Sequence, residues 1–299
     1  MSEPNQLQGC AITGIGSYVP ERILANSDLE HMVDTNDEWI TTRTGIKERR
    51  MAAEDEFTST MAVNAARKAL TQSELDPADL DLIVVATITP DMPFPATACL
   101  VQRELGASKA AAFDLEAACS GFIYALEVGR AFIASGIYQN VLIIGAEKLS
   151  SIIDWQDRNT CVLFGDGAGG AILEPTESGA GILDSILHMD GAGGGFLHVP
   201  GGGSRMPATI ESVNAKQHYI MQDGKKVFRF AVKGMADVSE KIMAQNNLTG
   251  DSISLFIPHQ ANKRIIDAAA KRCNISDNKV LINIDRFGNT TAGTIPIAM

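Results

Sequence analysis

The stretch from Phe113 to Phe122, FDLEAACSGF, joins a strand-like apolar segment to a helical one through a turn of small residues that contains a single cysteine. Residues 111–117 have the composition of a strand, and the segment 120–136 is apolar around most of the circumference of a helix. A helix that is apolar all round belongs in the interior of a protein. The stretch therefore predicts a buried strand-to-helix junction with Cys119 at the turn.

The segments on either side of this junction alternate in the same way. Strand-like runs rich in Val and Ile at 79–88, 111–117 and 140–147 alternate with helical patterns at 97–106 and 120–136. This alternation predicts an α/β fold with a largely parallel sheet that helices cover on both faces.

The second part of the chain repeats this order. A strand-like segment at 252–259 is followed by a helical one at 262–273 and by a further strand and helix within 281–299. The repeat indicates an internal duplication, with an N-terminal half at residues 1–175 and a C-terminal half at residues 176–299.

In this alignment the Cys119 turn and the turn at Asn289, in RFGNTTAG, occupy equivalent strand-to-helix junctions. The first half continues into the strand-like segments NVLIIGAE and GDGAGGAILEP, which have no counterparts in the second half. We therefore expect the C-terminal strands of the second half to be missing from this chain. The Gly-rich segment 191–205 predicts a long surface loop.

Composition excludes several classes of protein. The 299 residues are 45% hydrophobic and 20% charged, which is typical of a globular protein. A net charge of −11 argues against a nucleic-acid-binding protein. Without a signal peptide or a membrane-spanning apolar run, we expect a cytoplasmic protein with no membrane contact. Five cysteines without a C-x-x-C pair predict neither a disulfide framework nor a metal site.

The setting of Cys119 favours a nucleophile. A helix N-terminus directs backbone N–H groups and the positive end of its dipole at the sulfur, so we expect a lowered thiol pKa. The Cys119 N–H could also hold a developing oxyanion. The alternative is a packing cysteine, which is the role we assign to the other four. These are Cys10, Cys99, Cys161 and Cys273.

Two further polar residues lie at ends of predicted elements. His259, in IPHQAN, follows a strand-like run, and Asn289 lies in a Gly-rich turn. Ligand-contacting groups in open α/β sheets lie at such strand ends. A hydrogen-bonded loop histidine and a turn-forming asparagine are the alternatives. The G-x-G-x-x-G pattern at 165–170 precedes a strand instead of a helix, so we interpret it as turn and sheet structure and not as a dinucleotide site.

Taken together, these motifs resemble a known family from about Gly14 to Met299. They closely resemble the β-ketoacyl-acyl-carrier-protein synthase III enzymes of the thiolase superfamily. The motifs that carry the resemblance are DLEAACSGFIYAL, IPHQAN, GNTTAG, DEWITTRTGIKERR (37–50), LFGDGAGGAIL (163–173) and KVFRFAV (226–232). The resemblance implies a thiolase-like fold of two duplicated βαβαβαββ halves in α-β-α-β-α layers.

The resemblance also implies a Cys119, His259 and Asn289 triad. An acyl-CoA would load its acyl group onto Cys119, and malonyl-acyl carrier protein would then lose carbon dioxide and condense with it. The reaction initiates type II fatty acid synthesis, and coenzyme A thioester is its substrate, so no cofactor is expected. His259 and Asn289 would donate hydrogen bonds to the developing enolate oxygen.

Further residues match family positions for ligands. Trp39 and Arg158 would clamp the adenine of coenzyme A by stacking and cation–π attraction. The other predicted coenzyme A contacts are Thr35, Arg43, Phe228 and Asn262. Phe94 would reach into a partner subunit's acyl pocket, which implies a homodimer. Acyl carrier protein is acidic, and the cations predicted to meet it are Lys225, Lys226, Arg229, Lys263 and Arg264.

Two alternatives stay open at this point. One is a related synthase of secondary metabolism that uses other acyl donors. The other is a truncated, non-catalytic homologue, because family members continue into a Gly-rich segment with a second oxyanion donor that this sequence lacks. The preferred acyl chain is not predicted from the sequence.

Overall fold

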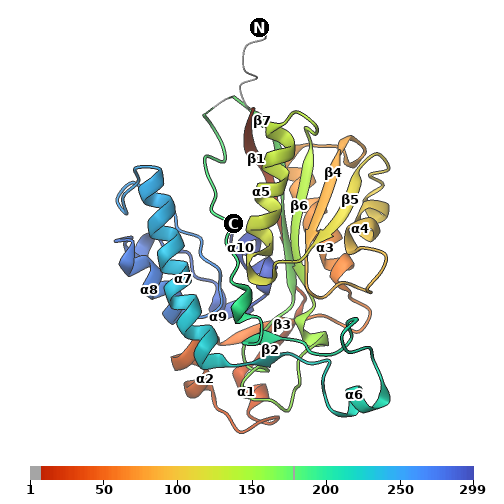
Figure 1. The fold of residues 1–299 in the computed structure, drawn as a ribbon, viewed down its shortest axis with the longest axis vertical. Coiled ribbons are helices and arrows are strands. Elements are labelled where there is room, and N and C mark those ends of the chain that lie inside the picture. The colour runs from red at the N-terminus through yellow and green to blue at the C-terminus, as the bar shows by residue number, and fades with distance from the viewer. Residues whose placement is uncertain (1–7, 178) are drawn as a thin grey trace.

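The computed structural model describes residues 8–177 and 179–299, and a five-stranded mixed sheet forms its centre (Figure 1). The strands, in the order β1-β7-β6-β4-β5, are β1 (Gly9–Tyr18), β7 (Gly167–Thr176), β6 (Val141–Glu147), β4 (Leu82–Ala86) and β5 (Ala111–Leu115). β6, β4 and β5 are parallel, and β7 runs antiparallel to both β6 and β1. The three predicted strands are confirmed, and β7 begins within the G-x-G-x-x-G pattern, at Gly167.

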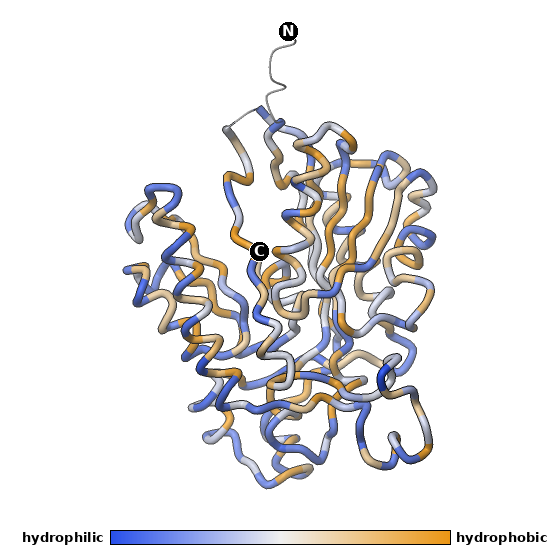
Figure 2. Tube along the Cα trace, viewed as in Figure 1, coloured by the Kyte–Doolittle hydropathy of each residue, from blue (hydrophilic) through white to orange (hydrophobic). Residues whose placement is uncertain are grey.

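Helices cover both faces of this sheet. Helices α3 (Thr58–Ser73) and α4 (Thr97–Leu105) pack on one face, where Ile83 and Val85 of β4 point. Helix α5 (Gly121–Ala134) packs on the other face, where Leu82 and Val84 of the same strand point. Because successive side chains of a strand point to opposite faces, a strand buried on both sides is apolar throughout. Figure 2 shows this as hydrophobic colour along the central strands.

A smaller subassembly follows β1 and carries the first predicted ligand residues. It consists of β2 (Arg22–Ala25), α1 (Asn26–Leu29), α2 (Asp37–Thr44) and β3 (Glu48–Met51), with β2 and β3 antiparallel. The fully buried Arg49 holds it together, donating hydrogen bonds to the carbonyl oxygens of Leu24 at 3.0 Å and Val162 at 2.9 Å. This arginine ties the subassembly to the segment before β7.

The second half is mostly helix and loop. Its elements are β8 (Leu197–His198), α6 (Ile210–Asn214), β9 (Met221–Gln222), α7 (Gly224–Gln245), α8 (Lys263–Arg272), α9 (Ile284–Phe287) and α10 (Thr294–Ala298). Short 3-10 turns are η1 (Pro77–Asp79), η2 (Ala118–Ser120), η3 (Leu149–Ser151), η4 (Gly191–Gly193), η5 (Asp277–Lys279) and η6 (Thr291–Gly293). α8 confirms the predicted helix at 262–273, and it packs beside α7 on the side of the molecule away from β5 (Figure 1).

The strands predicted at 252–259 and near 281 do not form. These segments meet through one parallel bridge, Phe256 with Val280, and two backbone hydrogen bonds of 2.8 and 2.9 Å. A strand is stabilised by a ladder of hydrogen bonds to its neighbours. Within the described residues no further strand flanks this pair, so the ladder does not extend.

The cysteines follow the prediction with one exception. Cys10, Cys161 and Cys273 are buried, whereas Cys99 is exposed on α4, so its predicted packing role is wrong. The apolar stripe of α4 is formed by Ala98 and Val101, and Cys99 falls outside it. Among the described residues, no helix is long and apolar enough to cross a membrane.

Candidate active site

Cys119 lies in η2, between the end of β5 and the start of α5, as the sequence predicts. Ala118, directly before it, has a φ of 45°, in the left-handed region that a residue with a side chain adopts at an energetic cost. The end of β5 is fixed by Asp114, whose carboxylate accepts hydrogen bonds of 2.7 Å from the N–H groups of Thr97 and Ala98. A strained turn on a fixed strand thus sets the position of the sulfur.

The protonation of Cys119 differs from the expectation. Burial, with a smaller contribution from the nearby charge of Glu147, raises the pKa of its thiol to about 12, although its own backbone N–H acts in the opposite direction. α5 begins only at Gly121, and the loss of hydration of a thiolate outweighs what the helix N-terminus offers. The prediction of a lowered pKa is therefore wrong, and the thiol is protonated at neutral pH.

Asn289 is held by backbone pairing with the segment before β7. Its N–H donates to the carbonyl of Leu163 at 2.9 Å, and its carbonyl accepts from the N–H of Gly165 at 3.1 Å. Its side-chain Oδ1 accepts from the N–H of Thr291 at 2.9 Å. Its Nδ2 makes no hydrogen bond within 8–177 and 179–299, so this amide group is available as a donor.

The segment after Asn289 packs directly on glycines of the sheet. A Cβ on Gly145 of β6 would lie 2.2 Å from the carbonyl oxygen of Ala292, and one on Gly169 of β7 would lie 2.6 Å from the carbonyl carbon of Pro296. The interpretation of 165–170 as turn and sheet structure is confirmed, and its glycines admit this close approach. η6 also contacts η2, which brings the Asn289 and Cys119 turns together.

His259 reaches the same segment through its side chain. Its Nδ1 lies 2.5 Å from Oγ1 of Thr294, and its Nε2 is buried without a hydrogen-bond partner among the described residues. Burial lowers its pKa to about 4, so the imidazole is neutral at pH 7. The structure thus connects all three predicted triad residues through residues 289–294.

Gln260 is a positioning residue that the sequence reasoning missed. The side chain is buried, and its Nε2 donates to the carbonyls of Pro258 and Leu281 at 3.0 and 3.1 Å. Its Oε1 accepts from the N–H groups of Asn283 and Ile284 at 3.1 and 3.2 Å. It fixes the turn that carries His259 where a strand was expected. Its place next to His259 in IPHQAN was the available signal.

Glu147, at the end of β6, is a second missed residue. Its carboxylate is fully buried and accepts hydrogen bonds from the hydroxyls of Thr87 and Thr89, at 3.1 and 2.6 Å, and from the N–H of Ile88 at 3.1 Å. Burial outweighs the lowering effect of these bonds and of the backbone of Ala292, so the pKa of this carboxyl is raised to about 7. No pattern in the sequence separated this glutamate from an ordinary strand end.

The two residues predicted to clamp adenine, Trp39 and Arg158, lie against each other. The guanidinium carbons of Arg158 and Arg43 lie 4.4 and 4.8 Å from the centre of the Trp39 ring, and Arg158 also pairs with Asp34 at 3.4 Å. A base needs about 3.5 Å of stacking distance on each face. Arg158 must therefore swing aside before a purine can lie on Trp39.

Other predicted ligand residues lie on separate segments of the chain. Asn262 caps α8, and its Nδ2 donates to the carbonyl of Arg43 at 2.9 Å, which joins α8 to α2. Thr35 has a buried hydroxyl without a partner among the described residues. Phe94 is 86% exposed. The ligand roles of these residues stay predictions.

The predicted cationic patch lies at the N-terminal ends of α7 and α8. The guanidinium of Arg264 stacks on the ring of Phe228, with 4.8 Å between its carbon and the ring centre. Lys225 and Arg229 are exposed, and Lys263 pairs with Asp267 at 2.7 Å. The cations of α7, Lys225 and Arg229, thus lie near those of α8, Lys263 and Arg264, and the stacking of Arg264 on Phe228 joins the two helices.

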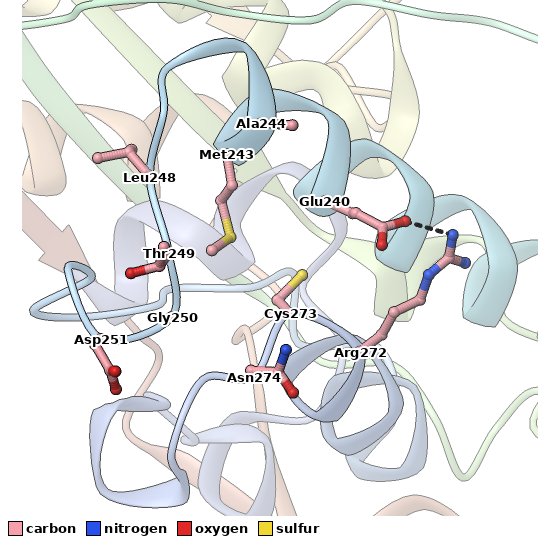
Figure 3. Close-up of a pocket in the computed structure, with 10 residues that line it drawn as sticks. All are labelled: Glu240, Met243, Ala244, Leu248, Thr249, Gly250, Asp251, Arg272, Cys273 and Asn274. Carbon is pink, nitrogen blue, oxygen red and sulfur yellow. Dashed lines mark hydrogen bonds and ion pairs between the residues drawn. The ribbon is translucent and has the colours of Figure 1, made fainter.

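A surface depression lies elsewhere in the second half. Figure 3 shows it between the end of α7 and the end of α8, where Glu240 and Arg272 form an ion pair of 2.6 Å. Its lining residues are Glu240, Met243, Ala244, Leu248, Thr249, Gly250, Asp251, Arg272, Cys273 and Asn274. None of them belongs to the predicted triad or ligand contacts. In the part of the chain that the structure describes, no group of three or more His, Cys, Asp or Glu side chains could hold a metal ion.

Comparisons with known proteins agree with this geometry. The family model described as 3-oxoacyl-[acyl-carrier-protein (ACP)] synthase III matches residues 113–191, and the model of its C-terminal part matches residues 243–299. The β-ketoacyl-[acyl-carrier-protein] synthase III of Caldanaerobacter subterraneus subsp. tengcongensis is 56% identical over 288 residues, 96% of this chain and 87% of that protein.

Solved structures share the fold. The crystal structure of 3-oxoacyl-[acyl-carrier-protein] synthase III from Aquifex aeolicus VF5 has a TM-score of 0.89 and 48% identity, over 97% of this chain and 89% of that one. The priming β-ketosynthase of the R1128 polyketide pathway has a TM-score of 0.88 but only 33% identity, over 99% of this chain and 88% of that one. The predicted α/β fold of the thiolase type is confirmed.

Proposed function

This chain belongs to the 3-oxoacyl-[acyl-carrier-protein] synthase III family, and from that premise we propose how its own residues perform the family's reaction. It is a condensing acyltransferase that joins an acyl-CoA to malonyl-acyl carrier protein and initiates fatty acid synthesis. Identity to the fatty acid enzyme is higher than to the polyketide enzyme, so the secondary-metabolism alternative is not favoured.

The first half-reaction loads Cys119. Its Sγ attacks the carbonyl carbon of the acyl-CoA, the C–S bond to coenzyme A breaks, and the thiol proton passes to the departing coenzyme A sulfur. Because burial keeps Cys119 protonated at neutral pH, this proton must move as the new thioester bond forms. Neutral His259 is the base within the same cluster of segments that can carry it.

The second half-reaction uses malonyl-acyl carrier protein. Its carboxylate leaves as carbon dioxide, and the electron pair forms an enolate on the thioester. Nε2 of His259 and Nδ2 of Asn289 stabilise the enolate oxygen, which gains charge only as the bond breaks. The enolate carbon then attacks the acyl-cysteine carbonyl, and Cys119 leaves as a thiolate that takes a proton from water.

A single observation carries this assignment. Residues 289–294 supply Asn289, hold His259 through Thr294 and include η6, which contacts the turn of Cys119. One short segment thus joins a nucleophile from the first half of the chain to two hydrogen-bonding groups from the second half.

Ligand contacts complete the proposal. Coenzyme A enters along Trp39, with Arg158 closing over the adenine, and the cations around Arg264 receive the acidic carrier protein. The chain works as a cytoplasmic homodimer in which Phe94 reaches the partner's acyl pocket; its high exposure is compatible with that role. Replacing Phe94 with Ala would then broaden the acyl-CoA preference.

Intact-mass spectrometry of the chain with a panel of acyl-CoAs tests the proposal. We expect a mass gain of one acyl group that the Cys119→Ala variant lacks. The Cys99→Ser variant is the matched control, since Cys99 is the exposed cysteine and should not carry the adduct. A folded chain that gains no acyl group from any acyl-CoA would instead support the non-catalytic homologue.

A further inference from the structure

Thr294 is the first residue of α10, and its side chain is buried beside His259. Its Oγ1 lies 2.5 Å from Nδ1 of His259 and 3.2 Å from the carbonyl oxygen of Thr291. A hydroxyl has one hydrogen to donate and lone pairs to accept. Its single hydrogen can therefore go either to Nδ1 or to the Thr291 carbonyl, but not fully to both.

The direction of this hydrogen decides the tautomer of His259. When the hydroxyl donates to Nδ1, the ring proton lies on Nε2, which is then a donor. When the hydroxyl donates to the Thr291 carbonyl, its oxygen accepts from Nδ1–H, and Nε2 carries a lone pair. The ring has only these two forms at neutral pH, because burial lowers its pKa to about 4.

The two half-reactions need opposite forms of the same atom. Loading of Cys119 needs an Nε2 that accepts the thiol proton, whereas decarboxylation needs an Nε2 that donates to the enolate oxygen. Nε2 is buried and has no partner among the described residues that would fix it in either form. The hydrogen bond at Nδ1 therefore determines which tautomer His259 adopts.

We propose that Thr294 is a positioning residue whose hydroxyl, by rotating between His259 Nδ1 and the Thr291 carbonyl, selects the His259 tautomer that each half-reaction requires. The inference rests on the proposed function. In loading, the Cys119 proton moves to Nε2 as the sulfur attacks the acyl-CoA carbonyl, and from Nε2 to the coenzyme A sulfur as the old thioester bond breaks. In decarboxylation, no proton leaves the ring, and Nε2–H only donates a hydrogen bond.

The Thr294→Val variant tests this with little change in shape. Without the hydroxyl, Nδ1 faces no acceptor, and a buried N–H without a partner is costlier than a buried lone pair. Losing the acceptor of Nδ1–H therefore shifts the ring toward the Nε2–H form, which can donate to the oxygen of a bound thioester. We expect the rate of Cys119 acylation by acyl-CoA to fall by about 10²-fold, the size of general-base catalysis. Decarboxylation of malonyl-acyl carrier protein should stay within about threefold of the wild-type rate, because the donor form is kept.

The Thr294→Ser variant is the matched control, since it keeps the hydroxyl and should restore acylation to near the wild-type rate. A second readout is the 15N NMR spectrum of histidine-labelled protein, in which His259→Gln identifies the His259 signals among the five histidines. Wild type should show shifts averaged between the two tautomers, and Thr294→Val should show shifts displaced toward the Nε2–H form.

Equal losses in both half-reactions, or a tautomer ratio in Thr294→Val that equals that of wild type, would overturn the proposal. A wild-type chain that forms no acyl adduct would refute the proposed function instead, and the NMR comparison would still test whether Thr294 controls the tautomer.

Discussion

Gly145 of β6 lies directly under Ala292, so closely that a Cβ on the glycine would be 2.2 Å from the Ala292 carbonyl oxygen. No side chain can occupy that space without displacing the backbone of η6. Because Asn289 precedes this turn and Thr294 follows it, the contact sets the height of both above the sheet. The absence of a side chain in one strand thus positions groups that are far away in sequence.

Replacing Gly145 with Ala should push η6 away from the sheet. We expect a loss of about 1–3 kcal/mol in the free energy of unfolding, as for overpacked cores, and a loss of decarboxylation larger than that of acyl loading. Urea denaturation and the two half-reaction rates measure this. Gly234→Ala in α7 is the control, since among the described residues no atom beyond its chain neighbours and the backbone of its own helix lies within 4 Å of its added Cβ. If Gly145→Ala behaves like Gly234→Ala, the contact does not position the site.

The buried charge of Glu147 should slow the reaction of Cys119 with alkylating reagents. The charge raises the thiol pKa, so Glu147→Gln should lower it and raise the thiolate fraction about tenfold for each unit of change. Peptide mass spectrometry after iodoacetamide treatment at several pH values measures the rate at Cys119. The exposed Cys99 in the same protein is the internal control. An unchanged Cys119 rate would show that burial alone sets its pKa.

His259 should make folding depend on pH in the acid range. Its pKa falls from the ordinary 6.5 to about 4 on folding, so the unfolded chain binds its proton first as the pH decreases. The stability contributed by the neutral imidazole is present above pH 6.5 and is lost as the pH falls toward 4. Denaturation of wild type and His259→Gln across this range should show a steeper loss for wild type. Parallel curves would contradict the lowered pKa.

Removal of the Arg158 guanidinium should weaken binding of coenzyme A through its nucleotide. A cation–π contact of about 0.5–2 kcal/mol corresponds to a rise in KM for acyl-CoA of about 2- to 30-fold in Arg158→Ala. Steady-state kinetics measure this. Acyl-pantetheine, which has no adenine, is the control substrate and should be used equally well by both proteins. A loss with both substrates would place Arg158 outside the adenine site.

Reversal of the charge at Arg264 should weaken use of malonyl-acyl carrier protein. Arg264→Glu should raise KM for the carrier protein and reduce its salt dependence, because a surface charge guides the encounter of acidic partners. KM for acyl-CoA should stay unchanged. Lys109→Glu, a change at an exposed lysine that pairs with Asp79, is the matched control. Equal effects of the two variants would indicate a response to net charge alone.

Cys119 and Gln260 show how far the sequence could lead. The strand-to-helix turn at Cys119 was predictable because apolar periodicity and small residues are local signals. The thiol pKa was not, because it depends on how tightly other segments bury the sulfur and on Glu147 from another strand. Gln260 was missed because three of its four hydrogen-bond partners lie in residues 281–284, more than 20 residues away along the chain.

Local patterns of residues were enough to predict the order of elements in the first half, the strand-to-helix turn of the nucleophile and the motifs that resemble the family. Those properties follow from the spacing of side chains along a local stretch of chain. Three other features became visible in the folded chain alone: residues 252–259 form no strand, Thr294 contacts His259, and the segment 289–294 packs on Gly145. These depend on hydrogen-bond partners and packing supplied by residues far apart in sequence, which no local pattern records.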